Sequence, residues 1–480
     1  MLLRPRRHTL SSRRSLYLCG GVALLLTSQL IQASPWIETD DAFLRADVQL
    51  LADAGLIQAS LNTYPLRWNQ IGDELEKIAP EGLTETEQLA YYHVRYTLKS
   101  RQLQRGNRQT RFVAGNRFPD NTGFGQFSRD EWGLYGSYSH MQANYAFRVN
   151  TNYVKQRDGD DDETAFNWDG SFVAFSVDDW YLVVGAVDRW WGPGWQNSLV
   201  WDSKSRPVPA VSVSYAGVDT PILKSWSIET LVGKQNSKQI GKQNSSTGSD
   251  YLWASRLSSK PLSFLSVGAS YQVWWGQDGK NLSDLPDVLF NKSDSDVAIT
   301  SVDAHVQLPK ISFPALAFTK TAQISHGAYV QYTTSDQEGK PDAAMFGWSG
   351  QTAIHRQVVR LIWEHQNITG YESTDVQNAP DYANQSSVEQ SYPGNNNGQF
   401  SASYELKNSD VIRTLIQFSN DHALNLGVYW GEDWDSDSRT VSSLEYIFPI
   451  ASSRIHLGYS NDNSHQGNDN NFWLGMDYRF

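Results

Sequence analysis

The sequence predicts an all-β transmembrane barrel of about 18 antiparallel strands, with a small α-helical bundle on its periplasmic side. Three observations carry this prediction. Apolar and polar residues alternate from residue 109 onwards, short and long connections alternate along the chain, and the last strand ends in an aromatic residue. We expect a signal peptide over residues 1–33, the helical bundle over residues 34–108 and the barrel over residues 109–480.

The composition excludes several other classes of protein. The 480 residues include 40 Lys and Arg against 52 Asp and Glu, a net charge of -12, so nucleic acid is not an expected partner. A single cysteine excludes a disulfide framework and a zinc site built from cysteines. The mean hydropathy of -0.50 argues against membrane helices but not against a barrel, because half of each barrel strand faces a polar lumen.

Residues 1–33 have the order of a secretory signal peptide. An apolar stretch runs from Leu16 to Leu26, and Ala33 is a small residue suited to cleavage. The basic segment before that stretch contains Arg4, Arg6, Arg7, Arg13 and Arg14. The alternative is a membrane anchor, which the short apolar stretch disfavours. Removal of this segment takes away Cys19 and leaves 35 basic against 52 acidic residues, a net charge of -17. We expect the processed protein to be located in the cell outer membrane.

Three short amphipathic helices are expected before the barrel. The first is capped by Asp40 or Asp41, ends at Gly55, and carries Leu44, Val48 and Leu51 on its apolar face. The second lies between Pro65 and Pro80, with a stripe of Trp68, Ile71, Leu75 and Ile78. The third starts with a capping box of Thr84 and Glu87, and its expected apolar face carries Leu89, Tyr92, Tyr96 and Leu103. The helices form either a plug for the barrel or a soluble adaptor domain.

From residue 109 the apolar period is two, which is typical of strands with one apolar face. Tyr145 to Tyr153 is one such segment, in which Arg148, Asn150 and Asn152 fall on the polar face and are expected in the lumen. Residues 265–275 and 424–430 alternate in the same way. Aromatic residues at the ends of the apolar faces, including Tyr145, Tyr153, Tyr271, Trp275 and Trp226, suit the girdles of a membrane barrel.

The connections divide into two groups. Tight turns are expected at residues 178–179, 260–261 and 448–453, and long polar loops at residues 155–165, 189–209, 276–296 and 368–398. Short turns on one side and long loops on the other are typical of outer-membrane barrels. An even strand count requires residues 399–419, with Asn408-Ser409-Asp410 at their centre, to be one bent strand rather than two.

The C-terminus is the sharpest single signal. Phe472, Leu474, Met476, Tyr478 and Phe480 alternate with polar residues, and the last residue is aromatic. Such a final strand resembles the assembly signal of bacterial outer-membrane barrels.

No catalytic residue, cofactor site or metal site is predicted. The sequence contains no HExxH, GxSxG, P-loop or CxxC motif. His355 and His365 are ten residues apart on one expected strand and could both face the lumen, although a strand histidine without special function is the simpler interpretation. The acidic residues 158–163 could hold calcium, but a solvated run of charge is favoured because Glu163 stands where a calcium-binding EF-hand loop needs glycine.

The most unusual segment joins paired tryptophans to glycine and proline. We expect it to bind polysaccharide, because indole faces stack on sugar rings and arginine can pair with a uronate carboxylate. The candidate residues are Arg189, Trp190, Trp191, Trp195, Trp201 and Arg206. The alternative is that these tryptophans fill the barrel mouth or join the interface girdle.

Several blocks in order resemble the capsule assembly Wzi family of outer-membrane proteins. They are residues 44–47 and 55–57, residues 61–66 (Leu-Asn-Thr-Tyr-Pro-Leu), residues 123–125 (Gly-Phe-Gly), residues 190–194 (Trp-Trp-Gly-Pro-Gly), residues 198–199 and 206–207, and the strand ending in Phe480. The Trp-Trp-Gly-Pro-Gly block is the most specific of them. The resemblance covers nearly the whole chain after the signal segment.

The resemblance implies an 18-stranded barrel with a periplasmic helical bundle and no enzymatic activity. It implies a lectin-like protein that binds exported capsular polysaccharide or exopolysaccharide and helps to attach and organise the capsule. We expect a monomer that also contacts outer-membrane lipids and lipopolysaccharide. The alternative is that the protein acts as a porin or substrate-specific channel for small solutes or saccharides. The polar residues expected in the lumen would also suit such a channel.

Overall fold

We analysed a computed structural model of the chain, which describes most of residues 35–479. The described ranges are 35–101, 107–119, 123–142, 144–158, 161–203, 206–237, 248–275, 280–290, 297–313, 322–335, 342–354, 356–369, 408–432, 437–465 and 467–479. The predicted signal segment lies outside the described residues. Among the described helices, none is long and apolar enough to cross a membrane.

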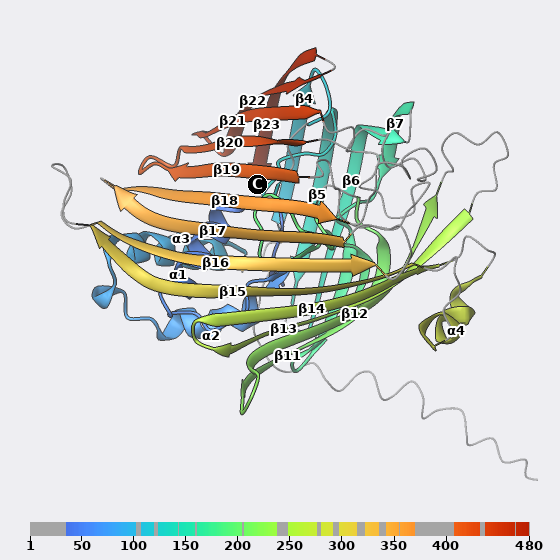
Figure 1. The fold of residues 1–480 in the computed structure, drawn as a ribbon, viewed down its shortest axis with the longest axis horizontal. Coiled ribbons are helices and arrows are strands. Elements are labelled where there is room, and N and C mark those ends of the chain that lie inside the picture. Colours follow the sequence, from blue (N-terminus) through green and yellow to red (C-terminus); the bar gives the residue numbers. More distant parts are fainter. Residues whose placement is uncertain are drawn as a thin grey trace, which may run out of the picture.

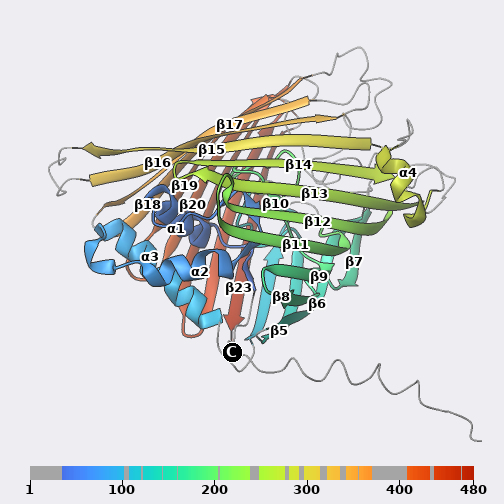
Figure 2. The same cartoon turned by 90° about the horizontal axis from the view of Figure 1, so that it is seen from below.

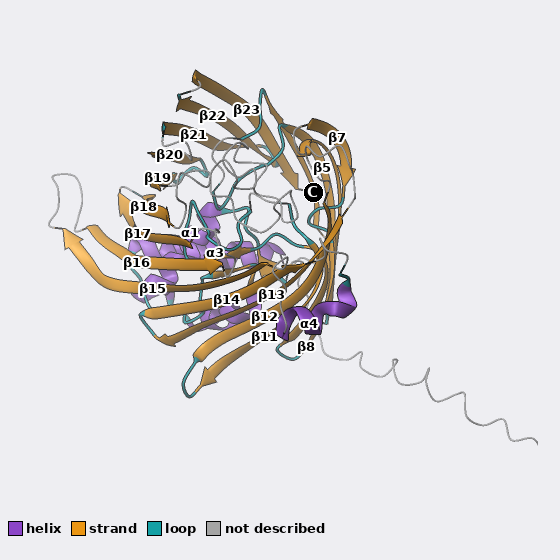
Figure 3. Ribbon diagram, turned by 45° about the vertical axis from the view of Figure 1, so that its right-hand side comes forward, coloured by secondary structure: helices purple, strands orange, loops and turns teal. Residues whose placement is uncertain are grey.

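The chain folds into a closed antiparallel barrel, with three helices at one end of it (Figure 1). Going round the barrel, β11 to β23 follow in sequence order, β23 pairs with β4, and β4 to β9 lead back to β11. The final strand therefore closes the barrel by pairing with the first one, as Leu474 does with Ala114. Figure 3 shows the strands as a continuous wall around the interior.

The barrel strands in the first part of the wall are β4 (Asn107–Gly115), β5 (Trp132–Met141), β6 (Tyr145–Asp158), β7 (Asp161–Asn167), β8 (Phe172–Val177), β9 (Trp180–Ala186), β11 (Pro209–Thr220), β12 (Lys224–Ser237), β13 (Gly248–Leu262) and β14 (Leu265–Trp275). The remaining barrel strands are β15 (Val297–Phe313), β16 (Ala322–Ser335), β17 (Asp342–Ile354), β18 (Gln357–Thr369), β19 (Asn408–Gln417), β20 (Ala423–Glu432), β21 (Ser438–Ile450), β22 (Ser453–Ser464) and β23 (Gly467–Arg479). Four short strands are not part of the wall and form two separate pairs. They are β1 (Trp36–Ile37), β2 (Thr63–Tyr64), β3 (Leu66–Arg67) and β10 (Trp190–Trp191).

The predicted count of 18 spanning strands is confirmed, but a different part of the chain settles the parity. β7 pairs with the C-terminal half of β6, and β8 pairs with its N-terminal half. β7 and β8 therefore count as one spanning strand that is interrupted at residues 168–171. Asn408, Ser409 and Asp410 lie within β19 and not in a turn, as the even count requires. Residues 399–407 lie outside the described residues.

The alternation of faces follows the sequence pattern. On β6, Val149 and Tyr153 are exposed on the outer surface, whereas Arg148, Asn150 and Asn152 line the interior. On β23, Phe472, Leu474, Met476 and Tyr478 are all exposed on the outside. Aromatic pairs such as Tyr153–Phe166 and Tyr215–Trp226 lie on the outer face, as expected for the girdles of a membrane barrel.

Short and long connections separate to the two ends of the barrel, which we call the short-turn end and the long-loop end. The short turn at residues 178–179 lies where it was predicted. The turn expected at residues 260–261 lies instead at 263–264, because residues 260–261 continue their strand. The turn expected within residues 448–453 is confined to 451–452, because residues 448–450 continue their strand. The predicted long loop at residues 155–165 is wrong, since β6 and β7 form a hairpin joined only by residues 159–160. The connection between β18 and β19 covers residues 370–407, which lie outside the described residues.

The helical segment has the caps that the sequence predicts. The first helix, α1 (Ala42–Asp53), is capped by the Asp41 carboxylate, which accepts a hydrogen bond from the Leu44 amide at 2.9 Å. Gly55 follows the helix with φ of 76°. The second helix is α2 (Trp68–Lys77), and α3 (Glu85–Arg101) begins at the predicted capping box, in which the Thr84 amide donates to Glu87 at 2.8 Å.

The predicted apolar face of α3 is wrong. Leu89, Tyr92 and Tyr96 are exposed, and Tyr96 is 73% accessible. The buried side chains are Glu87, Ala90, Tyr91, Val94 and Leu98. The small residues Ala90 and Val94 allow α3 to approach α1 closely, so the narrow stripe is the buried one.

The helices lie at the short-turn end, partly within the barrel. The Lys260 ammonium, near the turn after β13, donates to the Ile57 carbonyl at 2.9 Å, and Lys310 on β15 pairs with Glu87. Figure 2 shows α1, α2 and α3 together at one end of the barrel and a fourth helix, α4 (Leu285–Phe290), at the other. α4 covers Trp275 and Val273 on the outer surface, so Trp275 is not a free girdle residue. The helices therefore plug the barrel, although the periplasmic assignment of this end stays a prediction.

Candidate functional site

The connection between β9 and β11 folds back into the lumen. Its strand β10 pairs with β2 of the plug, with Trp190 opposite Tyr64 and Trp191 opposite Thr63. The side chains further along pack against the inner wall: Trp195 contacts a cluster that includes Met345 and Ile362, and Trp201 packs with Trp191. The loop and the plug thus form one packed body inside the barrel.

One buried carboxylate accepts several hydrogen bonds from the backbone of this loop. Glu364 on β18 is 0% exposed and accepts backbone hydrogen bonds from Trp195, from Gln196 at 3.0 Å and from Asn197 at 3.1 Å. The Tyr329 hydroxyl donates to the same carboxylate at 2.8 Å. A charged acceptor with four donors is a strong anchor, because hydrogen bonds to a charged group are about twice as strong as neutral ones.

The glycine after Pro193 is required for this turn. A Cβ atom at Gly194 would overlap the Asn197 carbonyl oxygen and lie 2.7 Å from Met345 Cε. Beside it, the Trp190 indole donates to the Gly194 carbonyl at 2.9 Å. The Gly-Pro-Gly sequence therefore serves close packing in the lumen and does not form a projecting loop.

Several of the sequence blocks that resemble the Wzi family meet around one arginine. The Arg45 guanidinium lies 4.3 Å from the ring centres of both Phe124 and Trp195 and 5.3 Å from that of Tyr64. It donates to the Pro193 carbonyl at 2.8 Å. Burial lowers the pKa of Arg45, although nearby Tyr64 and Glu364 favour its charge. These blocks, far apart in sequence, thus hold the plug, the loop after β4 and the loop after β9 together.

A second set of contacts ties the plug to the wall. Arg256 on β13 donates to Asp303 on β15 at 2.6 Å, to the Asn62 carbonyl at 2.8 Å and to the Thr63 hydroxyl at 3.0 Å. The Asn62 amide also donates to Asp303 at 2.9 Å. Because the segment around residue 63 is clamped between the wall and β10, it cannot leave without breaking both sets of bonds.

The structure places the candidate residues of the tryptophan segment inside the barrel. Trp190, Trp191, Trp195 and Trp201 are at most 1% exposed, so their faces are occupied by protein and cannot stack on a sugar in this state. Arg189 is 3% exposed and donates to Glu229 at 2.9 Å. The tryptophans lie against the plug and the inner wall, and not in the outer interface girdle. Arg206 differs, because its side chain lines a cavity.

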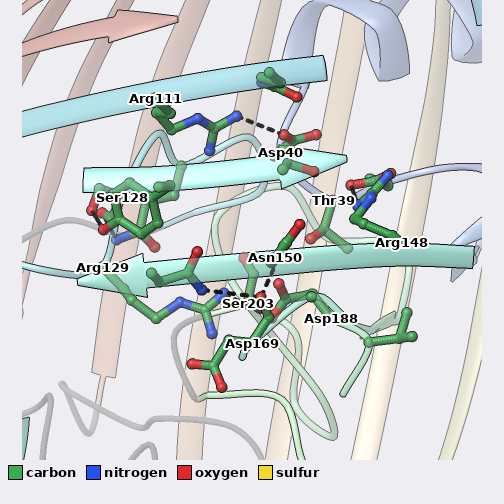
Figure 4. A pocket seen from close by; sticks show the side chains of 18 of the residues that line it. Thr39, Asp40, Arg111, Ser128, Arg129, Arg148, Asn150, Asp169, Asp188 and Ser203 are labelled. Atoms are coloured by element: carbon green, nitrogen blue, oxygen red, sulfur yellow. Dashed lines mark hydrogen bonds and ion pairs between the residues drawn. The ribbon is translucent and has the colours of Figure 1, made fainter. Parts of the chain in front are cut away.

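That cavity has a volume of about 160 Å³. Its walls are the inner faces of β4, β5 and β6, the residues after β1, part of the loop after β4, and both ends of the loop after β9. Figure 4 shows the side chains converging from these segments, with a dashed line joining Arg111 to Asp40. We call this space the lumen cavity.

The break between β7 and β8 brings one of its acids into place. The Asp169 carbonyl accepts hydrogen bonds from the side-chain amides of Asn150 at 2.9 Å and Asn152 at 3.1 Å, which draws the break against β6. Gly170 within it has φ of 82°, a left-handed conformation that glycine adopts readily. Irregularities of this kind re-aim side chains, and here the Asp169 carboxylate accepts from Arg206 at 2.8 Å.

The charges of the lumen cavity are paired. Its described lining includes four arginines and five carboxylates. The pairs are Arg111–Asp40 at 2.9 Å, Arg129–Asp188 at 2.7 Å, Arg148–Glu38, and Arg206 with both Asp130 and Asp169. Asp130, only 3% exposed, also accepts from the Tyr135 hydroxyl at 2.7 Å.

The plug and loop acids differ in their titration. Burial alone would raise the pKa of Asp40, but Arg111 and Arg101 outweigh it and lower the pKa to about 2. Glu38 behaves likewise, because Arg148 overcomes the effect of burial and lowers its pKa. At Asp188 burial dominates over the pairing with Arg129, and its pKa is raised.

Sequence reasoning found only part of this cavity. Arg148, Asn150 and Asn152 were predicted to face the lumen and do so, and Arg206 was a candidate residue. The partners Glu38, Asp40, Asp130, Asp169 and Asp188 were missed, because each lies in a loop or turn whose folding into the barrel no local pattern records. A charge imbalance among lumen-facing strand residues would have been the only hint.

The predicted histidine pair is wrong. β17 ends at Ile354 and β18 begins at Gln357, so His355 and His365 do not share a strand, and His355 lies outside the described residues. His365 lies on the outer surface beside Trp363 and contacts Asp410 at 3.2 Å. The acidic residues 158–163 form the end of the β6–β7 hairpin, and their side chains lie outside the described part. Within the described chain, no group of three His, Cys, Asp or Glu residues is arranged to hold a metal ion.

Comparison with known proteins decides the family. The family model for capsule assembly protein Wzi matches residues 102–426. The chain belongs to this family. The resemblance seen in the sequence is thereby confirmed, and the protein is an outer-membrane β-barrel of the Wzi family.

Two known proteins are similar to this chain. A Klebsiella pneumoniae protein, described as an uncharacterized 55.8 kDa protein in the cps region, is 26% identical over 259 residues, 53% of this chain. The matched region spans about half (50%) of that relative's length. The structure of Escherichia coli Wzi, an outer-membrane protein involved in group 1 capsule assembly and described as a carbohydrate-binding β-barrel, superposes with a TM-score of 0.74. At 17% identity the match covers 93% of this chain and 99% of the Escherichia coli protein, and it shows a common fold.

Proposed function

We propose that this protein is a non-enzymatic, lectin-like component of the outer membrane that binds exported capsular polysaccharide. In this proposal the protein attaches the polymer to the cell surface and helps to organise the capsule. The bound polymer lies at the long-loop end, which faces outwards, and the helical plug lies in the periplasm. The partners are the polysaccharide, outer-membrane lipids and lipopolysaccharide, and the protein acts as a monomer.

The observation that carries the proposal is the filled lumen of a Wzi-family barrel. The plug, the loop after β9 and the Glu364 and Arg256 anchors occupy the interior with side chains that are almost wholly buried. A barrel built to conduct solutes keeps an aqueous channel instead. The packed interior therefore supports a binding function in preference to a porin.

Membership of the Wzi family supports the choice of ligand. The Escherichia coli relative is described as binding carbohydrate, and the Klebsiella pneumoniae relative is named for a cps region. The long-loop end is the expected side for such a ligand, because the long connections after β14 and β18 begin there. Loops on a rigid scaffold commonly carry the binding function.

Polymer retention in cells tests the proposal. A strain lacking the protein should release most of its exported polysaccharide into the medium, and the wild-type chain should restore retention. The matched control is a variant in which the connection at residues 370–407 is shortened. The amount of barrel inserted in the membrane must be the same as for the wild type. Equal cell-bound polymer in the presence and absence of the protein would contradict the proposal.

Conductance separates the proposal from its alternative, a porin or substrate-specific channel. The purified barrel in a planar bilayer should pass little current, because the plug and the inward loop block the lumen. Stable, large-amplitude open channels in the wild-type protein would favour the channel function instead.

A further inference from the structure

The lumen cavity contains polar atoms that the protein leaves unpaired. Three side chains from three different segments each present one buried atom without a hydrogen-bond partner among the described residues. They are Ser203 Oγ from the loop after β9, Asn150 Oδ1 from β6 and Gln126 Oε1 from the loop after β4. Ser203 is only 6% exposed. Buried polar atoms are normally paired, so these three can accept hydrogen bonds from a molecule that enters the cavity.

The orientation of the two amide groups is fixed by their other hydrogen bonds. The Asn150 Nδ2 atom donates to the Asp169 carbonyl at 2.9 Å, and the Gln126 Nε2 atom donates to the Ser128 carbonyl. The unpaired atoms are therefore carbonyl oxygens, which accept hydrogen bonds but cannot donate them. An occupant must supply donors to satisfy them.

The charged groups of the lumen cavity also restrict which ligand could bind there. Each of the four arginines is already paired with a carboxylate, and the carboxylates outnumber them by one. A phosphate or uronate ligand would have to displace one of these acids to pair its own negative charge with an arginine. A sugar ring carries several hydroxyl groups that donate and accept at the same time, which suits the mixed lining.

The dimensions also suit one ring. The cavity of about 160 Å³ is close to the size of cavities that hold a single six-membered ring. Trp36, Phe127 and Phe172 also line the walls, although most of their surface is packed against protein, so the polar groups dominate the lining.

We propose that the lumen cavity is a binding subsite for one neutral, hydroxyl-rich sugar residue. The inference rests on the proposed function, since it assigns part of a polysaccharide ligand to a defined place in the barrel. It differs from the sequence expectation, because no tryptophan of the Trp-Trp-Gly-Pro-Gly block takes part.

Ligand-observed NMR with the purified protein tests the subsite. The protein is held in a detergent without a sugar headgroup, and the probes are glucose, galactose, mannose, N-acetylglucosamine, glucuronate and inorganic phosphate. At least one neutral sugar should bind more tightly than glucuronate and phosphate. Tighter binding of either anion than of every neutral sugar would overturn the assignment.

Two variants of Ser203 locate the binding. Ser203→Ala removes only a hydroxyl that has no hydrogen-bond partner among the described residues. It should leave the thermal stability unchanged and weaken binding of the neutral sugar by a few-fold to about tenfold. Ser203→Leu fills the space and should abolish binding. The matched control is Ser198→Ala, in the same loop but outside the cavity lining, which should bind the sugar as the wild type does.

The outcomes separate this inference from the proposed function. If the whole polymer binds the protein while no neutral sugar does, or while both Ser203 variants bind sugar like the wild type, the subsite is wrong and the proposed function stands. If a neutral sugar binds in a Ser203-dependent manner but the polymer is not retained by cells, the subsite stands and the proposed function falls.

Discussion

The Glu364 anchor offers the most direct test of how the lumen is closed. Glu364→Gln keeps the size of the side chain but replaces one carboxylate oxygen with an amide group that donates. In its best orientation the new amide faces the Tyr329 hydroxyl, which can reverse its hydrogen bond, and the Trp195 amide, which cannot. The two bonds from Gln196 and Asn197 then remain but lose the charge of their acceptor.

The expected loss follows from these bonds. One hydrogen bond to a charged group is removed and two are weakened, which together cost about 3–5 kcal/mol of loop stability. Each 1.4 kcal/mol is a factor of ten, so the population with the loop released should rise by about a hundredfold to a few thousandfold.

A single thiol reports the release. Cys19 is the only cysteine of the sequence and lies in the predicted signal segment, so Ser198→Cys introduces the only thiol of the processed chain. Ser198 is 2% exposed in the packed loop, and its labelling by a maleimide requires the loop to open. With Glu364→Gln, labelling should accelerate by the factor given above, and the channel current should rise.

The matched control is Glu445→Gln. Glu445 also faces the lumen but contacts Asn425 and His456 and not the loop. Its substitution should leave the labelling rate within a factor of two or three of the parent, corresponding to less than about 0.7 kcal/mol. Labelling of the Glu364→Gln protein at the parent rate would refute the idea that this carboxylate holds the loop in place.

Two further predictions concern the plug and its packing. Gly194→Ala should destabilise the inward loop by about 1–3 kcal/mol through overlap with the Asn197 carbonyl, seen as faster labelling at a buried thiol. Gly136→Ala should have no effect, because a Cβ there would meet only the Thr151 carbonyl oxygen at 3.8 Å, an ordinary contact. Equal behaviour of the two variants would be inconsistent with the packing described. His93 contacts the Asp47 carboxylate at 2.6 Å, and although burial alone would lower its pKa, this partner raises it. The contribution of the pair to stability is therefore complete below about pH 6.5, the unfolded value, and is lost as the pH rises through the raised folded pKa. After correction for the intrinsic pH dependence of exchange, the hydrogen-exchange protection of α3 should fall in that window for the wild type but not for His93→Gln.

The sequence was sufficient for the fold because the decisive signals are local. The alternation on β6 and β23, the Asp41 cap and the Thr84–Glu87 capping box each depend on residues within a few positions of one another. The pairing of β23 with β4 then follows from closure of the barrel.

The site could not be predicted in the same way because its contacts are remote in sequence. A Trp-Trp-Gly-Pro-Gly segment has the same local pattern whether it projects outwards or folds inwards. The acceptor that decides its direction, Glu364, lies 169 residues after Trp195. Likewise, the interruption at Asp169 is visible only once β7 and β8 are seen to share β6 as their partner.

The α3 helix shows a different limit of sequence reasoning. It carries two apolar stripes, and the aromatic one, with Tyr92 and Tyr96, is the more conspicuous in the sequence. The structure buries the smaller stripe against α1, because Ala90 and Val94 permit a close approach of the helix backbones. Hydrophobicity alone does not distinguish the two stripes.

Direct binding of the exported polysaccharide tests the central claim most closely. Purified capsular polymer from the parent strain should bind the protein in lipid nanodiscs with saturable affinity, and a Glu364→Gln barrel with a loosened loop should lose part of that affinity. The same wild-type preparation should show no large conductance in a planar bilayer. An absence of polymer binding by a correctly inserted wild-type barrel, together with a stable open-channel current, would contradict the account.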